Sequence, residues 1–278
     1  MGIVYHPLSL QEALRIRSRE HAQVLAGGTD WMLRRARFSM EERPVLNINR
    51  LKELQGITLQ GEELCIGAAC TLTGLLQSPL LPDFLRKPLV QMASPAIRNV
   101  ATIGGNVCNA SPAADALPML YALDAVLCLQ SEGKMELISV QDFILGPGRT
   151  RLGEGQLLTQ IRIPLRQVWR CFYQKVGMRR ANSLSKLSFY ALAEWSSGCL
   201  KDVRIAFGAV APTVVRSREA EQEIISGNRP FSSEQLQSIL AQYDRLLKPI
   251  DDARSNASYR REISLRLLRE YLRERIYA

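Results

Sequence analysis

Two glycine pairs, each in a segment of small and apolar residues, constrain this 278-residue chain more than any other feature. Gly27–Gly28 stands in LAGGTD at positions 25–30, and Gly104–Gly105 stands in ATIGGNVCNASPAAD at positions 101–115. Glycine lacks a Cβ atom, so its N–H groups can approach a ligand closely and its φ angle can turn positive. The pattern predicts two backbone loops, suited either to tight turns or to the oxygens of a phosphate.

The side chains around the second pair favour a ligand. Neither pair has a G-x-G-x-x-G fingerprint or the G-K-[ST] end of a P-loop, so each alone is more typical of a tight turn. Thr102, Asn106, Ser111 and Asp115 nevertheless place four small polar side chains in a segment rich in alanine and glycine. Asp115 precedes an apolar helix, where it either caps the helix or accepts hydrogen bonds from ribose hydroxyls. Together the segments predict a clamp on a nucleotide diphosphate.

Hydrophobic periodicity predicts a small strand–helix–strand unit in the first hundred residues. Ser9 and Glu12 have the capping-box spacing, and the helix that they open is expected to reach about Arg19. Further elements are expected as strands at 22–26 and 44–49, a second helix from Asp30, a hairpin at 57–70, and a helical stretch over 71–94 broken at Pro79, Pro82 and Pro88.

The pattern in the middle of the chain predicts an antiparallel sheet, because strand-like runs follow one another with few helices between them. These runs lie between 124 and 213, after a helix in ADALPMLYAL. From Val215 the pattern turns helical, with Ser233 as a cap for the helix that follows. A boundary between two sheets is expected near 165–180.

The composition limits the class of protein. A hydrophobic share of 46% is enough for a sizeable core, and no run approaches the about 18 apolar residues of a membrane span. No secretory leader is recognised, and the six cysteines are scattered with only two histidines beside them. These features predict a cytoplasmic protein with free thiols and neither a metal nor an iron–sulfur site.

The formal charge of +9 permits a nucleic-acid-binding function, but much of the excess lies in YRREISLRLLREYLRERIYA near the end of the chain. Arginines there alternate with glutamates, and apolar residues form a stripe at helical spacing, namely Ile263, Leu267, Leu268, Tyr271 and Ile276. A solvated basic face, which includes Arg260 and Arg261, explains the pattern, as does a docking face for an acidic partner. No aromatic platform accompanies it.

LAGGTD together with IRNVATIGGNVCNASPAADALP resembles the two FAD-binding motifs in the flavin subunit of molybdenum hydroxylases, a family that includes xanthine, carbon monoxide and nicotinate dehydrogenases. VLNINRLKELQGI, LLTQIRIP, FGAVAPTVVRSREAE and SYRREISLRLLRE extend the resemblance over nearly the whole chain, most closely to bacterial xanthine dehydrogenase FAD subunits. It implies an α+β protein. A PCMH-type FAD-binding fold would span an α/β subdomain at 1–55 and an antiparallel-sheet subdomain at 56–168, and an α+β domain would follow at 169–278.

The resemblance also implies which residues bind FAD. The diphosphate would lie on a first loop and a second loop, Ser111 and Asp115 would reach the diphosphate or the ribityl and ribose hydroxyls, and Leu158 would pack near the flavin. Lys175 matches a lysine at the polar edge of the flavin, with a surface lysine as the alternative. The first loop comprises Val24, Leu25, Ala26, Gly27, Gly28, Thr29, Asp30 and Trp31, and the second comprises Thr102, Ile103, Gly104, Gly105 and Asn106.

The chain departs from the family pattern at two places. Met92 stands where relatives carry an aromatic residue against the isoalloxazine ring, and Ser183–Leu184 replaces an acidic residue followed by isoleucine. A methionine covers a ring face but stacks less well than an aromatic residue.

The implied function is electron transfer without catalytic side chains or a bound metal in this chain. Electrons would come from [2Fe–2S] clusters in a small partner and a molybdenum cofactor in a large partner, and FAD here would pass them to NAD+ or another acceptor. Xanthine oxidation would place the complex in purine metabolism. Two alternatives stay open: a stand-alone FAD oxidoreductase of the same superfold, and a non-enzymatic basic module for assembly or nucleic acid.

Overall fold

The computed structural model describes residues 3–37, 43–165, 169–179, 182–227 and 229–277. The chain divides into two compact units that are not continuous in sequence. Unit 1 comprises 1–82, 93–111 and 124–165, and unit 2 comprises 83–92, 112–123 and 166–278. Unit 2 thus includes two short segments that lie within the sequence of unit 1.

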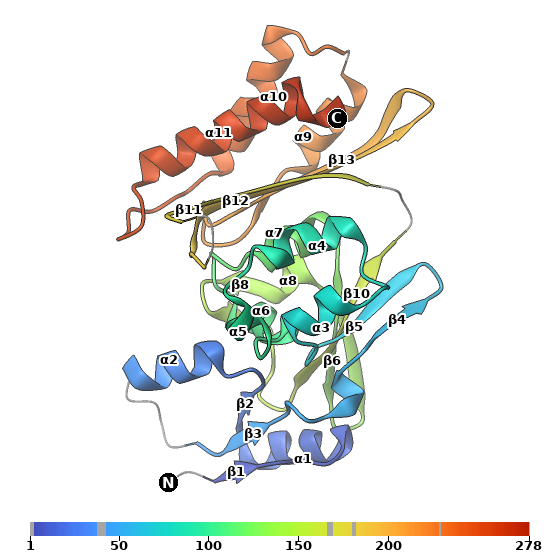
Figure 1. Cartoon of the computed structure of the whole chain (residues 1–278), viewed down its shortest axis with the longest axis vertical. Helices are drawn as coiled ribbons and strands as arrows, with labels where there is room; N and C mark the ends of the chain where they lie inside the picture. The colour runs from blue at the N-terminus through green and yellow to red at the C-terminus, as the bar shows by residue number, and fades with distance from the viewer. Residues whose placement is uncertain (1–2, 38–42, 166–168, 180–181, 228, 278) are drawn as a thin grey trace. The chain divides into compact units, whose positions relative to one another are not determined.

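Unit 1 contains a small parallel sheet whose three strands are joined in sequence by two helices (Figure 1). Its strand order is β1-β3-β2, and both pairs are parallel. The elements are β1 (Val4–Tyr5), α1 (Leu10–Glu20), β2 (Gln23–Leu25), α2 (Thr29–Arg37), β3 (Val45–Asn47) and the 3₁₀ helix η1 (Lys52–Leu54). The Ser9 side chain caps α1 by accepting from the Glu12 N–H at 3.2 Å, so this predicted start is confirmed.

The larger sheet of unit 1 has five antiparallel strands in the order β4-β5-β10-β6-β7. The predicted hairpin is present as β4 and β5, with Gly61 at φ +59° in the turn. The elements are β4 (Ile57–Gln60), β5 (Glu63–Gly67), α3 (Leu72–Gln77), α5 (Pro95–Arg98), α6 (Ile103–Asn109), β6 (Val126–Ser131), β7 (Lys134–Ser139), α8 (Val140–Phe143), the pair β8 (Ile144–Gly146) and β9 (Arg149–Thr150), and β10 (Leu157–Pro164).

Unit 2 is a four-stranded antiparallel sheet with helices on both faces (Figure 1). The strand order is β11-β12-β13-β14, and α9, α10 and α11 cover one face while α4 and α7 cover the other. The elements are α4 (Asp83–Val90), α7 (Ala116–Ala122), β11 (Arg170–Gly177), β12 (Ser185–Ser196), β13 (Cys199–Gly208), β14 (Val215–Arg216), α9 (Arg218–Ser226), α10 (Ser233–Leu246), α11 (Ala257–Arg273) and the 3₁₀ helix η2 (Arg275–Tyr277).

Alternation along β12 explains why both faces of this sheet are covered. Leu187, Phe189 and Ala191 point into the core under α9–α11, whereas Tyr190, between them in sequence, points to the other face. There its hydroxyl donates to the Phe84 carbonyl of α4 at 3.0 Å. Apolar residues at both odd and even positions therefore require two covering layers.

Several local predictions were wrong. Pro88 lies inside α4 instead of breaking a helix, and Ser232, not Ser233, caps α10 because the Ser232 oxygen accepts from the Gln235 N–H. Val215 begins the short strand β14, since β13 offers it a free edge for pairing.

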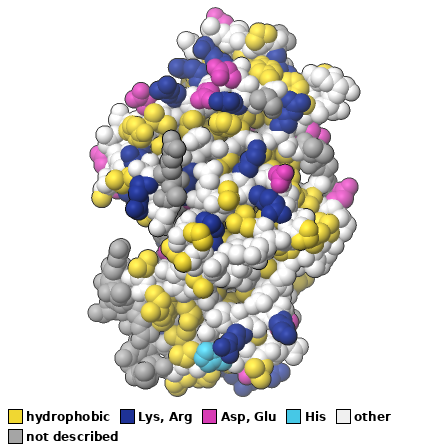
Figure 2. All heavy atoms as spheres, viewed as in Figure 1, with side chains coloured by type: hydrophobic (Ala, Val, Ile, Leu, Met, Phe, Trp, Pro, Cys, Tyr) yellow, Lys and Arg dark blue, Asp and Glu magenta, His cyan; other side chains and the backbone are white. Residues whose placement is uncertain are grey.

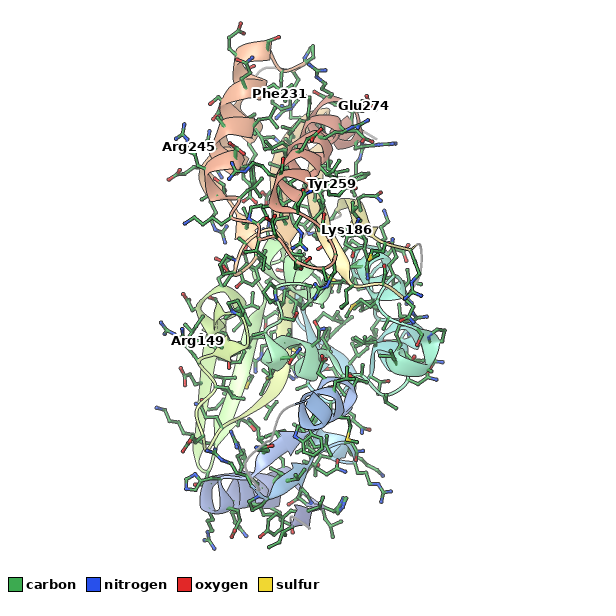
Figure 3. All side chains as sticks on the ribbon, turned by 90° about the vertical axis from the view of Figure 1, so that its left-hand side faces the viewer. Arg149, Lys186, Phe231, Arg245, Tyr259 and Glu274 are labelled. Carbon is green, nitrogen blue, oxygen red and sulfur yellow. The ribbon has the colours of Figure 1, made fainter. Side chains whose placement is uncertain are left out.

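The prediction that Arg260 belongs to a solvated basic face is wrong. This residue is 3% exposed, and its guanidinium donates to Asp252 Oδ1 at 2.6 Å and to the Ala209 carbonyl at 3.2 Å. Over the C-terminal helices, Lys and Arg side chains alternate with Asp and Glu (Figure 2). Lys186 lies 5.2 Å from the centre of the Tyr259 ring (Figure 3).

Candidate functional site

The first predicted loop joins β2 to the start of α2 in unit 1. Gly28 has φ +75°, a left-handed conformation that glycine adopts without strain. Within the described residues no hydrogen bond engages the N–H groups of Gly27, Gly28 or Thr29. The first N–H groups of a helix have no partner inside the helix, and the helix dipole makes them attractive to an anion. This turn therefore presents several free donors at one place.

Gly27 fixes the position of this turn against the segment before α6. A Cβ atom built on Gly27 would lie 2.1 Å from the Val100 carbonyl oxygen and 2.9 Å from Ala101 Cα. Only glycine fits this approach, so the close contact of two backbones explains the first glycine of the pair. The structure thus brings together the two glycine segments that lie about 75 residues apart in the sequence.

The second glycine pair is not a loop, which corrects the sequence interpretation. Gly104 and Gly105 form the first turn of α6, and Thr102 is its N-cap. The Gly104 N–H donates to the Ala68 carbonyl at 2.9 Å, and the Gly105 N–H donates to Thr102 Oγ1 at 3.1 Å. Both N–H groups are already engaged, that of Gly104 by the residue that follows β5 and that of Gly105 by the N-cap of the same helix. The Thr102 hydroxyl proton and the Asn106 side chain are the polar groups left for a ligand.

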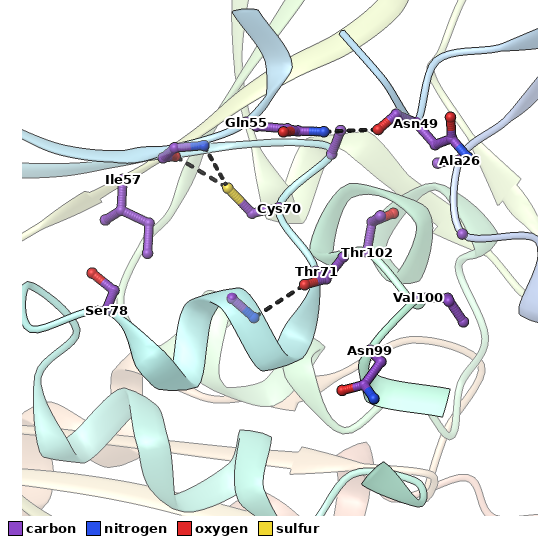
Figure 4. Close-up of a pocket in the computed structure, with 14 residues that line it drawn as sticks. Ala26, Asn49, Gln55, Ile57, Cys70, Thr71, Ser78, Asn99, Val100 and Thr102 are labelled. Atoms are coloured by element: carbon purple, nitrogen blue, oxygen red, sulfur yellow. Dashed lines mark hydrogen bonds between the residues drawn. The ribbon is translucent and has the colours of Figure 1, made fainter. Parts of the chain in front are cut away.

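A cavity of about 540 Å³ opens beside the first loop (Figure 4). Its wall combines side-chain amides from Asn49, Gln55 and Asn99 with small apolar groups, which suits a polar ligand with a flat apolar face. The full lining is Ala26, Gly27, Asn49, Gln55, Gly56, Ile57, Ala69, Cys70, Thr71, Gly74, Ser78, Asn99, Val100 and Thr102.

Hydrogen bonds hold this wall in place. The Gln55 amide nitrogen donates to the Asn49 carbonyl at 2.7 Å, and the Cys70 thiol lies 3.1 Å from both the N–H and the carbonyl of Gly56 (Figure 4). Asn99 Oδ1 accepts from the Thr73 hydroxyl at 2.7 Å. The side-chain amides of Gln55 and Asn99 are therefore oriented by the protein before any ligand binds.

A second group of predicted residues meets in unit 2. The Lys175 ammonium lies 2.6 Å from Asp115 Oδ2, and the two side chains are only 8% and 9% exposed. The Ser185 hydroxyl donates to Asp115 Oδ1, and Lys175 also donates to the Gln91 carbonyl at 3.1 Å. The alternative that Lys175 is a surface lysine is therefore wrong. Helix capping is wrong for Asp115, because its side chain makes no cap hydrogen bond to α7.

Burial dominates the electrostatics of this group. Desolvation raises the pKa of the Asp115 carboxyl, while the Lys175 charge and the Ser185 hydroxyl act against that rise. The Tyr173 hydroxyl shares this environment, because burial and the Asp115 charge raise the pKa of Tyr173.

The remaining predicted residues have varied surroundings. Met92 and Leu158 are each 5% exposed, and Leu158 lies in β10 beside a register shift opposite β6. The Trp31 indole N–H donates to Gln23 Oε1 at 3.3 Å, and Ser111 is half-buried. Asp30 is exposed at the start of α2.

Several residues of these two groups were not predicted from the sequence. Asn49, Gln55 and Asn99 reach the cavity from segments that carry no glycine pair, and no local signal separates them from other surface amides. Tyr173 stands two residues before Lys175 on one strand, so the alternation of β-strand side chains was a usable signal for it. Ser185 had none.

In the described ranges no group of three or more His, Cys, Asp or Glu side chains is arranged to hold a metal ion. None of the helices in that same part of the chain combines the length and the apolar content needed to cross a membrane.

Comparison with known proteins identifies the family. Residues 1–166 match the FAD binding domain in molybdopterin dehydrogenase, and residues 172–275 match the CO dehydrogenase flavoprotein C-terminal domain. The chain belongs to the molybdenum hydroxylase flavoprotein family. The cofactor of this flavoprotein is FAD, it is an oxidoreductase component, and its α+β fold class is confirmed.

Individual relatives of the flavoprotein act on different substrates. A xanthine dehydrogenase FAD-binding subunit of Escherichia coli O157:H7 is 29% identical and covers 92% of this chain and 89% of its own. A glyceraldehyde dehydrogenase medium chain of Sulfolobus acidocaldarius is 29% identical, with 92% and 91% covered. A carbon monoxide dehydrogenase structure from Hydrogenophaga pseudoflava is 25% identical and has a TM-score of 0.89, and the match covers 97% of this chain and 95% of the other. The family therefore does not determine the reducing substrate.

One unsatisfied polar atom of unit 1 fits the cofactor of this flavoprotein family. Asn106 Oδ1 is buried and has no hydrogen-bond partner among the described residues. A buried polar atom without a partner is costly, and a bound ligand relieves that cost. With the free N–H groups of the first loop in the same unit, it provides donors and an acceptor suited to FAD.

Proposed function

We propose that this chain is the FAD-carrying electron-transfer subunit of a multi-subunit molybdenum hydroxylase. The observation that carries the proposal is the first loop. Its free N–H groups at Gly27, Gly28 and Thr29 lie at the start of a helix, which is the arrangement that binds a diphosphate. Thr102 and Asn106 would add a hydroxyl and an amide to the same group.

We assign the other FAD contacts by family position and local chemistry. Lys175 would bring a positive charge to the polar edge of the flavin, and Met92 would cover one face of its ring. Leu158 would supply apolar contact, and Ser111 would donate to the diphosphate or to a sugar hydroxyl. When bound, FAD supplies a carrier that takes up electrons singly and releases them as a pair. The protein binds, orients and shields this group, and no side chain here exchanges a proton with the reducing substrate.

The partners and the acceptor follow from the same proposal. The relatives are named as subunits or medium chains, which supports a complex with a large molybdenum-cofactor subunit and a small [2Fe–2S] subunit. We propose NAD+ or another soluble acceptor, a cytoplasmic location, xanthine as the first substrate to test, and no nucleic-acid or membrane partner. We also propose subdomains at 1–55 and 56–168 and a C-terminal domain at 169–278.

The test begins with the purified chain. Heat release of the cofactor is expected to yield one FAD, and no FMN, per chain, with the absorption bands of a flavin before release. In the assembled complex, xanthine under anaerobic conditions is expected to bleach the flavin, and NAD+ to restore the colour. A colourless chain that takes up no FAD but binds RNA with steep salt dependence would overturn the proposal. Bleaching of the isolated chain by a substrate would favour a stand-alone oxidoreductase.

The conformation of the first loop gives a separate prediction. Gly28→Ala is expected to lower FAD affinity, because the turn would leave the left-handed conformation and move the donors. Strain of about 1–2 kcal/mol predicts a loss of about 5- to 30-fold. Titration of the apoprotein with FAD measures this loss.

Gly133→Ala is the matched control for Gly28→Ala. Gly133 has the same φ of +75°, and a Cβ there would meet no atom within 4 Å. It lies in the turn between β6 and β7, so its strain should lower stability and leave FAD affinity unchanged. Equal loss of FAD in both variants would show that Gly28 acts only through stability.

A further inference from the structure

The five-stranded sheet of unit 1 (Figure 1) has an apolar face and a polar face. On its central strand β10, Ile161 is fully buried, whereas Gln160 and Arg162 on either side of it are half-buried. The register places Cys65 of β5 opposite Arg162 and Cys128 of β6 opposite Gln160. Because side chains alternate between the faces of a sheet, these four residues share the face opposite to Ile161. This polar face therefore holds a guanidinium and an amide side by side on its central strand.

A recess of about 330 Å³ lies on this polar face. Three side-chain amides and the guanidinium of Arg162 line this sheet recess, and Leu10 and Met135 add apolar surface. The amides belong to Gln60 of β4, Gln130 of β6 and Gln160 of β10. The recess thus gathers polar side chains from three strands of one sheet.

The sheet recess is a different space from the cavity beside the first loop. The described residues that line it include neither glycine pair, and the two spaces have only the Gln55–Gly56 segment in common. All of its lining residues belong to unit 1. The FAD contacts proposed above therefore leave the sheet recess unassigned.

Arg162 brings an unpaired positive charge to the sheet recess. Its Nε donates to Gln160 Oε1 at 2.9 Å, and the N–H groups of its two terminal nitrogens have no partner among the described residues. Every other buried or half-buried arginine in the described ranges pairs with a carboxylate or donates to a backbone carbonyl. The protein thus leaves the terminal nitrogens of Arg162 open to an acceptor from outside the chain.

The bond between Arg162 and Gln160 also orients the amide. A guanidinium has only donors, so the group of Gln160 that it meets must be the amide oxygen. The NH₂ group of Gln160 is therefore turned away from Arg162 and is free to donate to a ligand. Donors on neighbouring residues then face the same recess, an arrangement that suits an anion. The planar fork of an arginine matches the two oxygens of a carboxylate.

Glu53 limits the charge of such an anion. It lines the same recess, and its Oε1 accepts from the Leu10 N–H at 2.9 Å. This hydrogen bond lowers the pKa of the Glu53 carboxyl, so a negative charge stays beside the recess. A second or third negative charge on the ligand would be repelled, because the described lining residues include one cation and one anion.

We propose that the sheet recess binds the carboxylate of a small organic monoanion, with Arg162 holding both carboxylate oxygens and Gln160 adding a donor. The site is separate from the FAD site, and the inference does not depend on the proposed function. A chain that takes up no FAD but binds the carboxylate would leave it standing.

The experiment titrates the purified protein, with whatever FAD it carries, and follows the ligand by NMR. Acetate and benzoate are the probes, and benzamide is the neutral molecule of the same shape as benzoate. Saturable binding of benzoate is expected, with benzamide weaker by at least about tenfold. Inorganic phosphate and citrate are expected to bind more weakly than benzoate because of Glu53. Equal binding of benzamide, or no saturable binding of either carboxylate, would overturn the inference.

Variants of β10 test the residues that hold the carboxylate. Arg162→Met is expected to weaken benzoate binding by at least about tenfold, and Arg162→Lys by less, because lysine keeps the charge but not the fork. Gln160→Glu is expected to block the site, since its carboxylate would pair with Arg162 inside the protein. Arg149→Met removes an exposed arginine of β9 in the same unit and is expected to leave binding unchanged.

Gln160→Glu keeps the inference testable if Arg162→Met does not fold, because it retains the guanidinium. Unchanged benzoate binding in Gln160→Glu, or equal losses in Arg162→Met and Arg149→Met, would overturn the assignment. The same titration of the chain in its native assembly separates a free ligand from a carboxylate of a partner chain. Benzoate binding is expected to persist there, and its loss on assembly would overturn the small-molecule assignment.

Discussion

Gly27→Ala is expected to lower FAD affinity by at least about tenfold, which corresponds to about 1.4 kcal/mol. The new Cβ would lie 2.1 Å from the Val100 carbonyl oxygen, a distance that no side-chain rotation can relieve. The first loop or the segment before α6 must therefore move, and the free N–H groups would move with it. Titration of apoprotein with FAD, monitored by flavin fluorescence, measures the change.

A matched variant separates the loss of the site from a loss of stability. A Cβ on Gly67 would lie 2.4 Å from the Leu54 carbonyl oxygen, so Gly67→Ala creates a similar backbone clash in the same unit. Gly67 itself does not line the cavity beside the first loop, although its clash falls on the Leu54–Gln55 segment. This variant should therefore lose stability, and its FAD affinity per folded chain should stay above that of Gly27→Ala. Wild-type affinity in Gly27→Ala would contradict the role given to this contact.

Glu221→Ala is expected to destabilise unit 2 by about 3–5 kcal/mol, the usual cost of leaving one charge of a buried pair alone. Arg216 Nε lies 2.8 Å from Glu221 Oε1, and the two side chains are 5% and 4% exposed. The same carboxylate accepts from the Ile205 N–H of β13 at 2.8 Å, and Arg216 donates to carbonyls at the end of α7. One substitution therefore disturbs β13, β14 and α7 together.

Chemical denaturation of the purified protein measures this loss, with an exposed ion pair as the control. Asp244 pairs with Arg261 at 2.7 Å, but the side chains are 39% and 45% exposed. Asp244→Ala is expected to cost no more than about 1 kcal/mol, because solvent screens this pair. Similar losses in the two variants would contradict the importance given to burial. A double variant, Arg216→Met with Glu221→Leu, should regain part of the lost stability.

Local patterns in the sequence predicted local structure well. The Ser9 cap, the β4–β5 hairpin and the long strands β12 and β13 all follow from spacing over a few residues. Predictions failed where a distant partner decided the conformation. Val215 pairs with β13, and Pro88 is accommodated within α4. The second glycine pair became a helical turn because Ala68 accepts the Gly104 N–H.

By itself, the sequence determined the family, the cofactor class and the positions of the two glycine segments. These depend on residue types at short spacing, which are readable without coordinates. Only the tertiary structure decided that Gly27 packs on Val100 and that Asp115 pairs with Lys175, 60 residues later. It also decided that 83–92 and 112–123 belong to unit 2. The physical reason is that backbone contact and burial join segments whose separation leaves no periodic signal in the sequence.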